Sequence, residues 1–238
     1  MRVPRVFVAA LEPGPVVLAP AEARHLALVL RLVPGAAVRA FDGRGFEAAG
    51  VVRDVVREIE GARVTLELGE AEPSTREAAR RLTLAVALLK GDKLAGVVRQ
   101  GTELGVIAFR PFRSRHASVP ELSPAKLVRL RRVAQEAAKQ SQRAVVPEVC
   151  EATALEQLPL APLTLVAHPG AALRVREAVP AEADELTLLT GPEGGFGEAE
   201  VEALEARGAL AVRLGERVLR AETAPLALAA ALLVPEAL

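Results

Sequence analysis

Residues 191–197, with the sequence GPEGGFG, form a segment suited to holding a ligand close to the backbone. The segment contains four glycines and one proline. Glycine lets a ligand approach the main chain and leaves amide N–H groups unshielded. The Lys-Ser/Thr ending of a P-loop and the G-x-G-x-x-G spacing of a dinucleotide loop are both missing. Taken alone, such a segment is more often a generic turn.

A second segment, residues 214–224, combines charged side chains with the start of a helix. It contains two arginines, Arg217 and Arg220, and two glutamates, Glu216 and Glu222. An apolar helix follows, and Thr223 is a suitable N-cap for it. The free N–H groups at a helix N-terminus favour anionic groups. The alternative interpretation is a capped helix with surface ion pairs.

The chain around these segments alternates strands with helices from residue 82 onward. Residues 82–89 (LTLAVALL) form a continuous apolar run, which is typical of a strand buried on both faces. The alternation predicts a parallel sheet covered by helices on both faces, with ligands bound beyond the carboxyl ends of the strands. Both segments follow predicted strands, which favours one shared site. The other expected strands are 106–109, 163–167, 186–190 and 210–214, and the expected helices are 91–104, 124–143, 198–207 and 223–234.

The first 72 residues follow a different pattern, which predicts a small β-barrel. Several short strands surround one helical stretch at 20–32, and residues 42–45 (DGRG) predict a hairpin turn. Residues 70–80 are polar, contain Pro73 and resemble a linker. We therefore expect a domain of residues 1–72 and a second of residues 73–238. The expected strands of the first domain are 5–9, 15–18, 37–42, 46–52 and 63–68.

Charge is distributed unevenly, although the formal net charge is zero. Residues 71–145 contain 15 basic and 6 acidic residues, whereas residues 146–238 contain 6 basic and 15 acidic ones. The basic middle indicates either a polyanionic partner or a solvated surface. The segment 110–116 (RPFRSRH) follows a predicted strand and can present guanidinium groups to phosphates. Aromatic residues make up only 3%, which argues against base stacking as the main contact.

Several classes of protein are disfavoured by composition. A single cysteine excludes a disulfide framework and a Cys-based zinc site, and three distant histidines give no support for a metal site. The longest apolar run, residues 224–234, is too short to cross a bilayer. We expect a cytoplasmic protein without membrane or metal. The last helix, apolar on all sides, is either central to its domain or buried against a second copy, and we favour the dimer.

The motifs resemble those of a known family nearly end to end. The matching segments are 4–7 (PRVF), 90–93 (KGDK), 102–106 (TELGV), 191–195 (GPEGG) and 214–224 (LGERVLRAETA). They are similar to the bacterial 16S ribosomal RNA uridine-N3 methyltransferases, the RsmE family of the SPOUT methyltransferases. The resemblance implies a PUA-like RNA-binding β-barrel, then a SPOUT α/β domain with a parallel sheet and a trefoil knot. It also implies S-adenosyl-L-methionine as cofactor, a homodimer, and 16S rRNA within the small ribosomal subunit as partner.

The resemblance also suggests which residues act on the substrate. The uridine N3 proton must leave. We expect Arg220 to stabilise the resulting negative charge, with Arg217 as the second candidate. Glu222 or Glu193 either accepts the proton or holds an arginine in place. The expected cofactor contacts are Leu189, Thr190, Gly191, Gly195, Leu214, Gly215, Val218, Leu219, Thr223 and Ala224. The expected RNA contacts are Arg5, Arg31, Arg110, Arg113, Arg115, Arg129 and Arg132.

Two alternative functions remain open from the sequence. One is a SPOUT methyltransferase that modifies the ribose 2′-hydroxyl of RNA. The other is a non-catalytic RNA-binding or ribosome-assembly protein that has kept the fold. The identity of the target nucleotide and of the proton acceptor does not follow from the residues.

Overall fold

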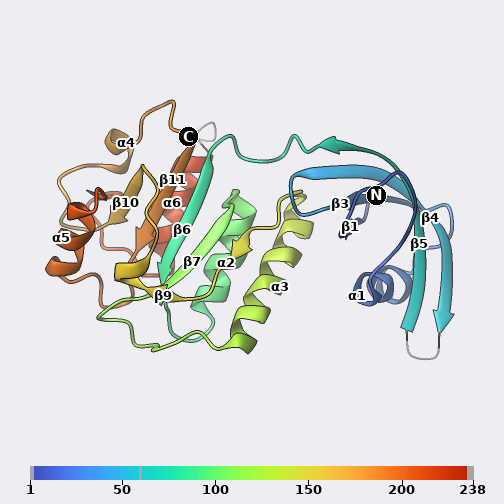
Figure 1. Ribbon diagram of the computed structural model, residues 1–238, viewed down its shortest axis with the longest axis horizontal. Helices are drawn as coiled ribbons and strands as arrows, with labels where there is room; N and C mark the ends of the chain where they lie inside the picture. The colour runs from blue at the N-terminus through green and yellow to red at the C-terminus, as the bar shows by residue number, and fades with distance from the viewer. Residues whose placement is uncertain (1–2, 59–60, 235–238) are drawn as a thin grey trace. The chain divides into compact units, whose positions relative to one another are not determined.

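The computed structural model describes residues 3–58 and 61–234 (Figure 1). Contacts divide the chain into two compact units, one of Met1–Glu77 with Ala138–Val146 and one of Ala78–Ala137 with Pro147–Leu238. The sequence places the change of domain between residues 72 and 73, and that boundary stays a prediction. The return of residues 138–146 to the first unit is not part of that prediction.

The first unit is built on a five-stranded sheet in the order β1-β3-β4-β5-β2. Neighbouring strands are antiparallel except β1 and β3, which are parallel. The strands are β1 Arg5–Phe7, β2 Gly14–Val17, β3 Ala37–Phe41, β4 Phe46–Glu58 and β5 Gly61–Pro73. Within the described residues the hydrogen-bonded path runs from β1 to β2, and closure into a barrel stays a prediction.

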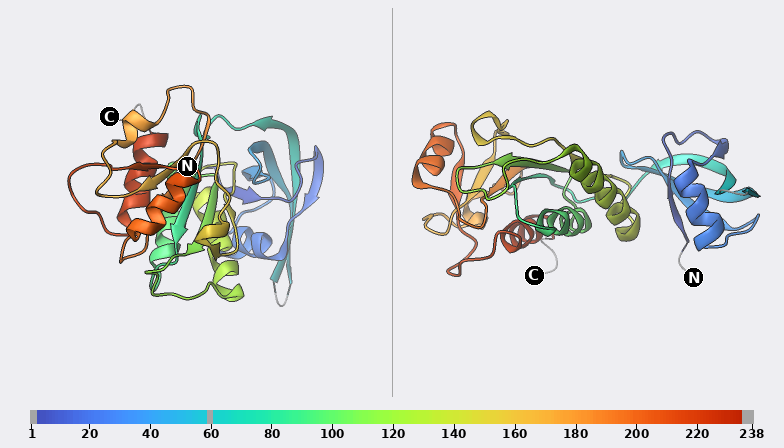
Figure 2. Two further views of the ribbon diagram at one scale, coloured as in Figure 1. Left: turned by 60° about the vertical axis from the view of Figure 1, so that its left-hand side comes forward. Right: turned by 90° about the horizontal axis from the view of Figure 1, so that it is seen from below.

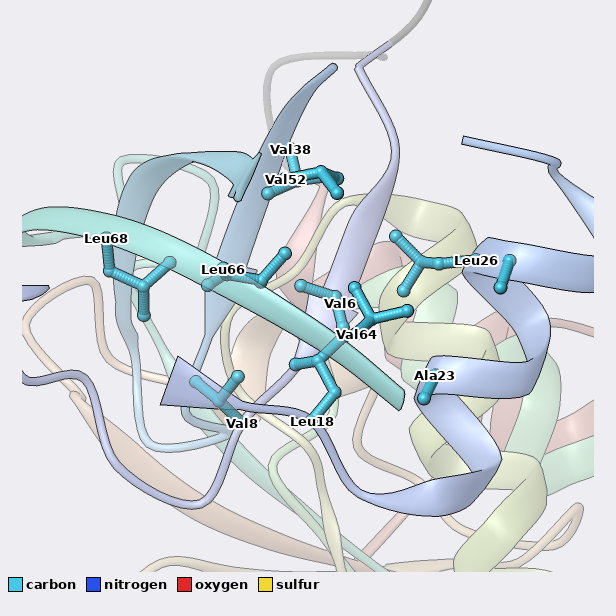
Figure 3. Close-up of a cluster of buried hydrophobic side chains, with 12 residues drawn as sticks. Val6, Val8, Leu18, Ala23, Leu26, Val38, Val52, Val64, Leu66 and Leu68 are labelled. Carbon is cyan, nitrogen blue, oxygen red and sulfur yellow. The ribbon is translucent and has the colours of Figure 1, made fainter. Parts of the chain in front are cut away.

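One helical segment covers the core of this sheet. Helix α1 (Pro20–Arg24) continues as a π-helical turn, η1 (His25–Val29), and its buried residues include Ala23 and Leu26. Figure 3 shows the apolar side chains of β4 and β5 gathered on the same cluster as these two residues. The predicted helix over 20–32 is therefore too long. It ends before Arg31, whose φ of 54° is left-handed.

The hairpin between β3 and β4 confirms the predicted turn at residues 42–45. The carboxylate of Asp42 accepts hydrogen bonds from the N–H groups of Arg44 at 2.7 Å and Phe46 at 3.2 Å. Strands β4 and β5 are each longer than predicted. Residues 70–73, which resemble a linker in the sequence, form the end of β5, because an exposed strand end does not need apolar side chains.

The segment after residue 137 is held in the first unit by a largely buried ion pair. Arg143 is 3% exposed and donates two hydrogen bonds, of 2.9 and 2.7 Å, to one carboxylate oxygen of Glu77. The other oxygen of Glu77 accepts the N–H groups of Ala144 and Val145 at 2.8 and 3.0 Å. Removing Glu77 takes these bonds away from a buried guanidinium group and from two backbone N–H groups.

Replacement of Glu77 by alanine should therefore destabilise the protein by about 3–5 kcal/mol, the usual loss when one member of a buried ion pair is removed. Urea unfolding followed by circular dichroism measures this change, because the chain has no Trp or Tyr for fluorescence. The matched control is Glu67→Ala, which breaks an exposed pair with Arg53. The control should lose about 1 kcal/mol or less. Equal losses in the two variants would contradict the structural role of Glu77.

The second unit contains a parallel sheet, which confirms the prediction. Its strand order is β12-β10-β11-β6-β7-β8, with β9 paired to β7, and every neighbouring pair is parallel. The strands are β6 Arg81–Ala87, β7 Ala108–Arg113, β8 Glu148–Val149, β9 Thr153–Ala154, β10 Thr164–Ala167, β11 Glu185–Thr190 and β12 Leu210–Val212. Strand β7 lies later than the predicted 106–109, so Arg110 and Arg113 belong to a strand rather than to the loop after it.

Helices cover both faces of this sheet. Successive residues of a strand point to opposite faces, so the contacts of each residue show which helix covers which face. Ala85, Ala87 and Phe112 face the cluster that contains helix α5. A Cβ at Gly101 of helix α2 would lie within 3.5 Å of both Phe109 and Leu84, so α2 covers the other face. Figure 2 shows α2 and α6 side by side. The helices are α2 Lys93–Leu104, α3 Pro124–Ser141, α4 Val175–Ala178, α5 Glu198–Ala206 and α6 Thr223–Leu233, with a 3-10 turn η2 at Leu155–Gln157.

None of the helices in residues 3–58 and 61–234 combines the length and the apolar character needed to cross a membrane. Helix α3 ends two residues earlier than predicted because Gln142 adopts a left-handed φ of 66°. The turn places Arg143 beside Glu77 in the first unit.

Candidate functional site

A cavity of about 430 Å³ lies at the carboxyl ends of four neighbouring strands of the parallel sheet. Residues 191–196 follow β11, residues 213–222 follow β12, His168 follows β10, and Lys93 begins the helix after β6. The two segments that the sequence predicts to form one ligand site therefore line the same pocket. Ligands of parallel α/β sheets bind at this edge, where the strand ends leave a crevice between loops.

In the glycine loop, residues 191–197, a side chain added at Gly191 would crowd the backbone of the loop itself. A Cβ at Gly191 would lie 3.2 Å from backbone atoms of Gly195 and Phe196, and Gly195 has a left-handed φ of 72°. The N–H of Gly195 donates to the carbonyl of Pro192 at 2.9 Å, which closes a tight turn. Phe196 anchors the loop by stacking on Phe112, with the two ring centroids 6.0 Å apart. The loop is thus narrow, and Phe196 attaches one end of it to the core.

The arginine loop, residues 213–222, forms the opposite wall of the pocket and leads into helix α6. The carbonyl of Arg220 accepts the N–H groups of Thr223 and Ala224, each at 2.9 Å. The N-cap of α6 is Glu222, and no side chain caps this end, so the prediction of Thr223 as N-cap is wrong. Val218 is 80% exposed, which is unusual for a large apolar residue. Arg213 and Glu216 form an ion pair within the loop.

Lys93 joins the two walls of the pocket. Its ammonium group lies 3.0 Å from a carboxylate oxygen of Glu193 in the glycine loop and 3.3 Å from one of Glu222. The hydrogen bond to Glu193 raises the pKa of Lys93, and the bond to Glu222 adds to this effect. The lysine therefore stays protonated and bridges two carboxylates that belong to different loops.

The same bridge lowers the pKa of both carboxyl groups. At Glu193 burial acts to raise the pKa, but hydrogen bonds from Lys93 and from backbone N–H groups outweigh it. At Glu222 a backbone hydrogen bond is the main cause of the lowered pKa, and Lys93 contributes after it. Both groups are ionised at neutral pH, which makes them weak proton acceptors.

The pocket includes most of the residues that the sequence selected for catalysis and cofactor contact. Arg217, Arg220, Glu193 and Glu222 all line it. Leu189 does not, because its side chain is fully buried in the core, and Thr223 does not line it either. The expected cofactor contacts that do line the pocket are Thr190, Gly191, Gly195, Leu214, Gly215, Val218, Leu219 and Ala224.

Two family models match the chain. One, described as an RNA methyltransferase domain, matches residues 76–233, and another, described as an RNA methyltransferase PUA domain, matches residues 18–57. The ribosomal RNA small subunit methyltransferase E of Bacillus subtilis is 33% identical over 86% of this chain and 84% of its own length. The chain belongs to the ribosomal RNA small subunit methyltransferase E family. The resemblance seen in the sequence is confirmed.

One further relative and two solved structures are also similar to this chain. The ribosomal RNA small subunit methyltransferase E from Synechocystis is 35% identical over 88% of this chain and 70% of its own length. The crystal structure of the Neisseria gonorrhoeae enzyme bound to S-adenosyl methionine matches with a TM-score of 0.88, at 29% identity and 98% coverage of both chains. A putative methyltransferase from Legionella pneumophila, also solved with this cofactor, matches with a TM-score of 0.86 at 26% identity, over 99% of this chain and 98% of its own.

In this family member, the arginines expected to contact RNA differ in their burial and in their contacts with other side chains. The side chain of Arg5 is 8% exposed, lies 2.7 Å from a carboxylate oxygen of Glu47 and stacks over Phe41. These contacts give Arg5 a structural role in the first unit. Arg129 forms two hydrogen bonds to Asp92, of 2.7 and 3.1 Å. Of the remaining expected contacts, Arg110 is half-buried, and those that are exposed are Arg31, Arg113, Arg115 and Arg132.

Among the residues that line the pocket of this methyltransferase E protein, Lys93 and His168 have titratable side chains to which sequence reasoning assigns no role. In the sequence, Lys93 appears only as part of the KGDK motif, and His168 is one of three distant histidines. A usable signal exists, because each follows a predicted strand, as the selected loops do. Among residues 3–58 and 61–234, no group of three or more His, Cys, Asp or Glu side chains is arranged to hold a metal ion. The residues that line the pocket include one lysine, three arginines, two glutamates and several apolar side chains.

Proposed function

We propose that the protein transfers the methyl group of S-adenosyl-L-methionine to the N3 atom of a uridine in the 16S rRNA of the small ribosomal subunit. Membership of the methyltransferase E family supports the substrate, and two similar structures that contain this cofactor support the donor. The observation that carries the proposal is the single pocket that the glycine loop and the arginine loop form at the strand ends.

The residues of the pocket fit this cofactor. Its volume of about 430 Å³ lies within the range of small-molecule sites. The Thr190 hydroxyl is buried without a hydrogen-bond partner among the described residues, so a ligand group can satisfy it. Gly191 and Gly195 keep the loop open to a flat ring, while Leu214 and Leu219 supply apolar contact. When bound, S-adenosyl-L-methionine supplies an electrophilic sulfonium methyl group.

The arginine loop would make the uridine nitrogen reactive. The N3 atom is an imide nitrogen that carries a proton at neutral pH, and its loss spreads negative charge over the flanking carbonyl oxygens. A fixed guanidinium group near those oxygens stabilises that charge. Arg220 borders the pocket and is exposed, so it can meet a nucleotide that enters from solvent. Arg217, which lies in the same loop, is the second candidate.

Glu193 and Glu222 would act as positioning residues. Their lowered pKa values make them poor bases toward an imide proton, and both contact Lys93. We therefore favour the interpretation in which they hold Lys93, and with it both loops, in place. The proton then passes to solvent at the open side of the pocket.

This arrangement predicts a pH profile without a carboxylate step. The lowered carboxyl pKa values mean that the bridge is complete above pH 4.5, their ordinary pKa, and is lost as the pH falls further. The raised Lys93 pKa means that the bridge is complete below pH 10.5, its ordinary pKa, and is lost as the pH rises further. The pH dependence of kcat/KM between about pH 5.5 and 8.5 should therefore show no inflection from Glu193 or Glu222.

Replacing Lys93 by methionine should change that profile. The substitution removes the cation that contacts both carboxylates, so their pKa values rise, most of all at Glu193, where Lys93 is the main cause of the lowering, and an acidic inflection moves toward the measured range. Lys90→Met is the matched control, because Lys90 contacts Glu193 through its backbone N–H, which the substitution keeps. An inflection in the unmodified enzyme that Glu222→Gln abolishes would instead identify Glu222 as the base.

The reaction itself is tested by incubating the protein with labelled S-adenosyl-L-methionine and small ribosomal subunits from a strain that lacks the enzyme. Nucleoside analysis by mass spectrometry should find the label as a base-methylated uridine, substituted at N3. Label on the ribose 2′-oxygen would identify a 2′-O-methyltransferase instead. Subunit binding without any transferred label would identify a non-catalytic binding protein.

Three further features belong to the same proposal. The glycine and arginine loops would form part of a trefoil knot, and the protein would work in the cytoplasm as a homodimer. Support for the dimer comes from helix α6, which is apolar along its whole length although several of its residues are only half-buried. An unpartnered apolar helix face is unfavourable in water. Light scattering should give the mass of two chains.

A further inference from the structure

The segment that follows strand β7 packs directly on the glycine loop. A Cβ at Gly194 would lie 3.0 Å from the Cβ of His116, and one at Gly197 would lie 3.6 Å from the His116 ring. Contacts this close leave almost no free space between His116 and Gly194. The basic segment 110–116 and the glycine loop therefore form two layers in contact, although about 80 residues separate them in the sequence.

One carboxylate hydrogen-bonds to both layers. The Oε2 atom of Glu200 accepts the N–H of Gly197 at 2.9 Å, and its Oε1 atom accepts the N–H of Arg115 at 2.9 Å. Glu200 lies in the first turn of α5, whose N-cap is Gly197. The last residue of the glycine loop and the backbone of Arg115 are thus fixed to the same rigid group.

Helix capping accounts for only half of this arrangement. In a capping box the third helical residue, Glu or Gln, accepts the N–H of the N-cap residue. That function needs only the oxygen that binds Gly197. The bond from the second oxygen to Arg115 adds nothing to the helix end, but it connects the basic segment to the glycine loop.

We propose that Glu200 is a positioning residue that couples RNA binding at the basic segment to cofactor binding at the glycine loop. This inference rests on the proposed function, in which the exposed Arg113 and Arg115 contact RNA. RNA that fixes the basic segment also fixes the glycine loop through Glu200 and His116. The cofactor then binds to a loop that is already ordered, so it binds more tightly. Linkage requires that the cofactor strengthen RNA binding by the same factor.

The test measures the affinity for S-adenosylhomocysteine, the donor without its transferable methyl group, by equilibrium dialysis with and without small ribosomal subunits. For the unmodified protein, subunits should tighten binding by about fivefold or more, the lower end of typical coupling. Glu200→Gln should reduce this factor to less than about twofold, because glutamine keeps one acceptor oxygen for the helix cap and loses the other. Glu202→Gln, at an exposed position of the same helix with the same charge change, should keep the full factor.

The outcomes separate this inference from the proposed function. If the unmodified protein binds neither S-adenosylhomocysteine nor subunits, the proposed function fails and the inference fails with it. If it binds both but shows no coupling, or the same coupling in Glu200→Gln, the proposed function stands and the inference is overturned. A purely structural role for Glu200 would weaken ligand binding equally with and without subunits.

Amide hydrogen exchange gives a second readout that is independent of the ligand. Subunit binding should slow exchange at Gly194, Gly195 and Gly197 in the unmodified protein and in Glu202→Gln. In Glu200→Gln the same amides should keep the exchange rates of the free protein. Slowing of equal size in all three proteins would contradict the coupling.

Discussion

Arg220→Ala should lower the turnover number about 100- to 1000-fold, the usual loss when one fixed donor to a developing negative charge is removed. The affinity for S-adenosyl-L-methionine should change by less than about threefold, because this side chain acts on the nucleotide rather than on the cofactor. Arg220 lies on the arginine loop at the border of the pocket. Single-turnover kinetics measures the first quantity, and calorimetry measures the second.

Two companion variants sharpen the Arg220 experiment. Arg220→Lys keeps the charge but loses the planar fork of donors, so its turnover should lie between those of the unmodified enzyme and the alanine variant. Arg176→Ala removes an exposed arginine of helix α4, outside the residues that line the pocket, and should leave turnover unchanged. If Arg220→Ala abolishes cofactor binding while its circular dichroism is unchanged, Arg220 is a binding residue and the assignment is wrong.

Gly191→Ala should weaken cofactor binding by roughly 5- to 150-fold, which corresponds to about 1–3 kcal/mol of overpacking. The new methyl group would lie 3.2 Å from backbone atoms of Gly195 and Phe196. Backbone atoms cannot rotate away as a flexible side chain can, so the loop itself must move. Calorimetric titration with S-adenosyl-L-methionine measures the loss.

The glycine loop supplies its own control for this substitution. Gly197→Ala meets its nearest neighbours at 3.6 Å, which is an ordinary contact, and Gly197 has an extended backbone that alanine adopts without strain. The variant keeps the N–H that donates to Glu200. It should bind the cofactor with unchanged affinity. A loss as large in Gly197→Ala would mean that the close contact at Gly191 is not the cause.

Features of the fold that depend on neighbouring residues could be predicted from the sequence. The apolar run that forms β6 and the glycines after β11 are local signals, and the rule that ligands bind at the ends of parallel strands joined two loops into one pocket. The turn at Asp42 is equally local, because its carboxylate bonds to N–H groups two and four residues away.

Features that depend on distant partners could not be predicted. Lys93 lies 100 residues from Glu193, and no sequence pattern predicts the ion pair between them. The pairing of Arg143 with Glu77 spans 66 residues and draws a short segment back into the first unit. Exposed strand ends are also hard to identify, since polar residues 70–73 complete β5 in a stretch with the composition of a linker.

The discontinuous first unit has a consequence for synthesis on the ribosome. Its sheet is complete in sequence at Pro73, but Glu77 meets Arg143 only after residues 78–142 have been made. By then β6, α2 and β7 have been synthesised as well, so the contacts of the first unit are completed only after much of the second unit has been made. A nascent chain that stops before residue 143 lacks the arginine that pairs with the Glu77 carboxylate. Because two separate segments of the chain form the first unit, no single uninterrupted gene segment encodes all of it.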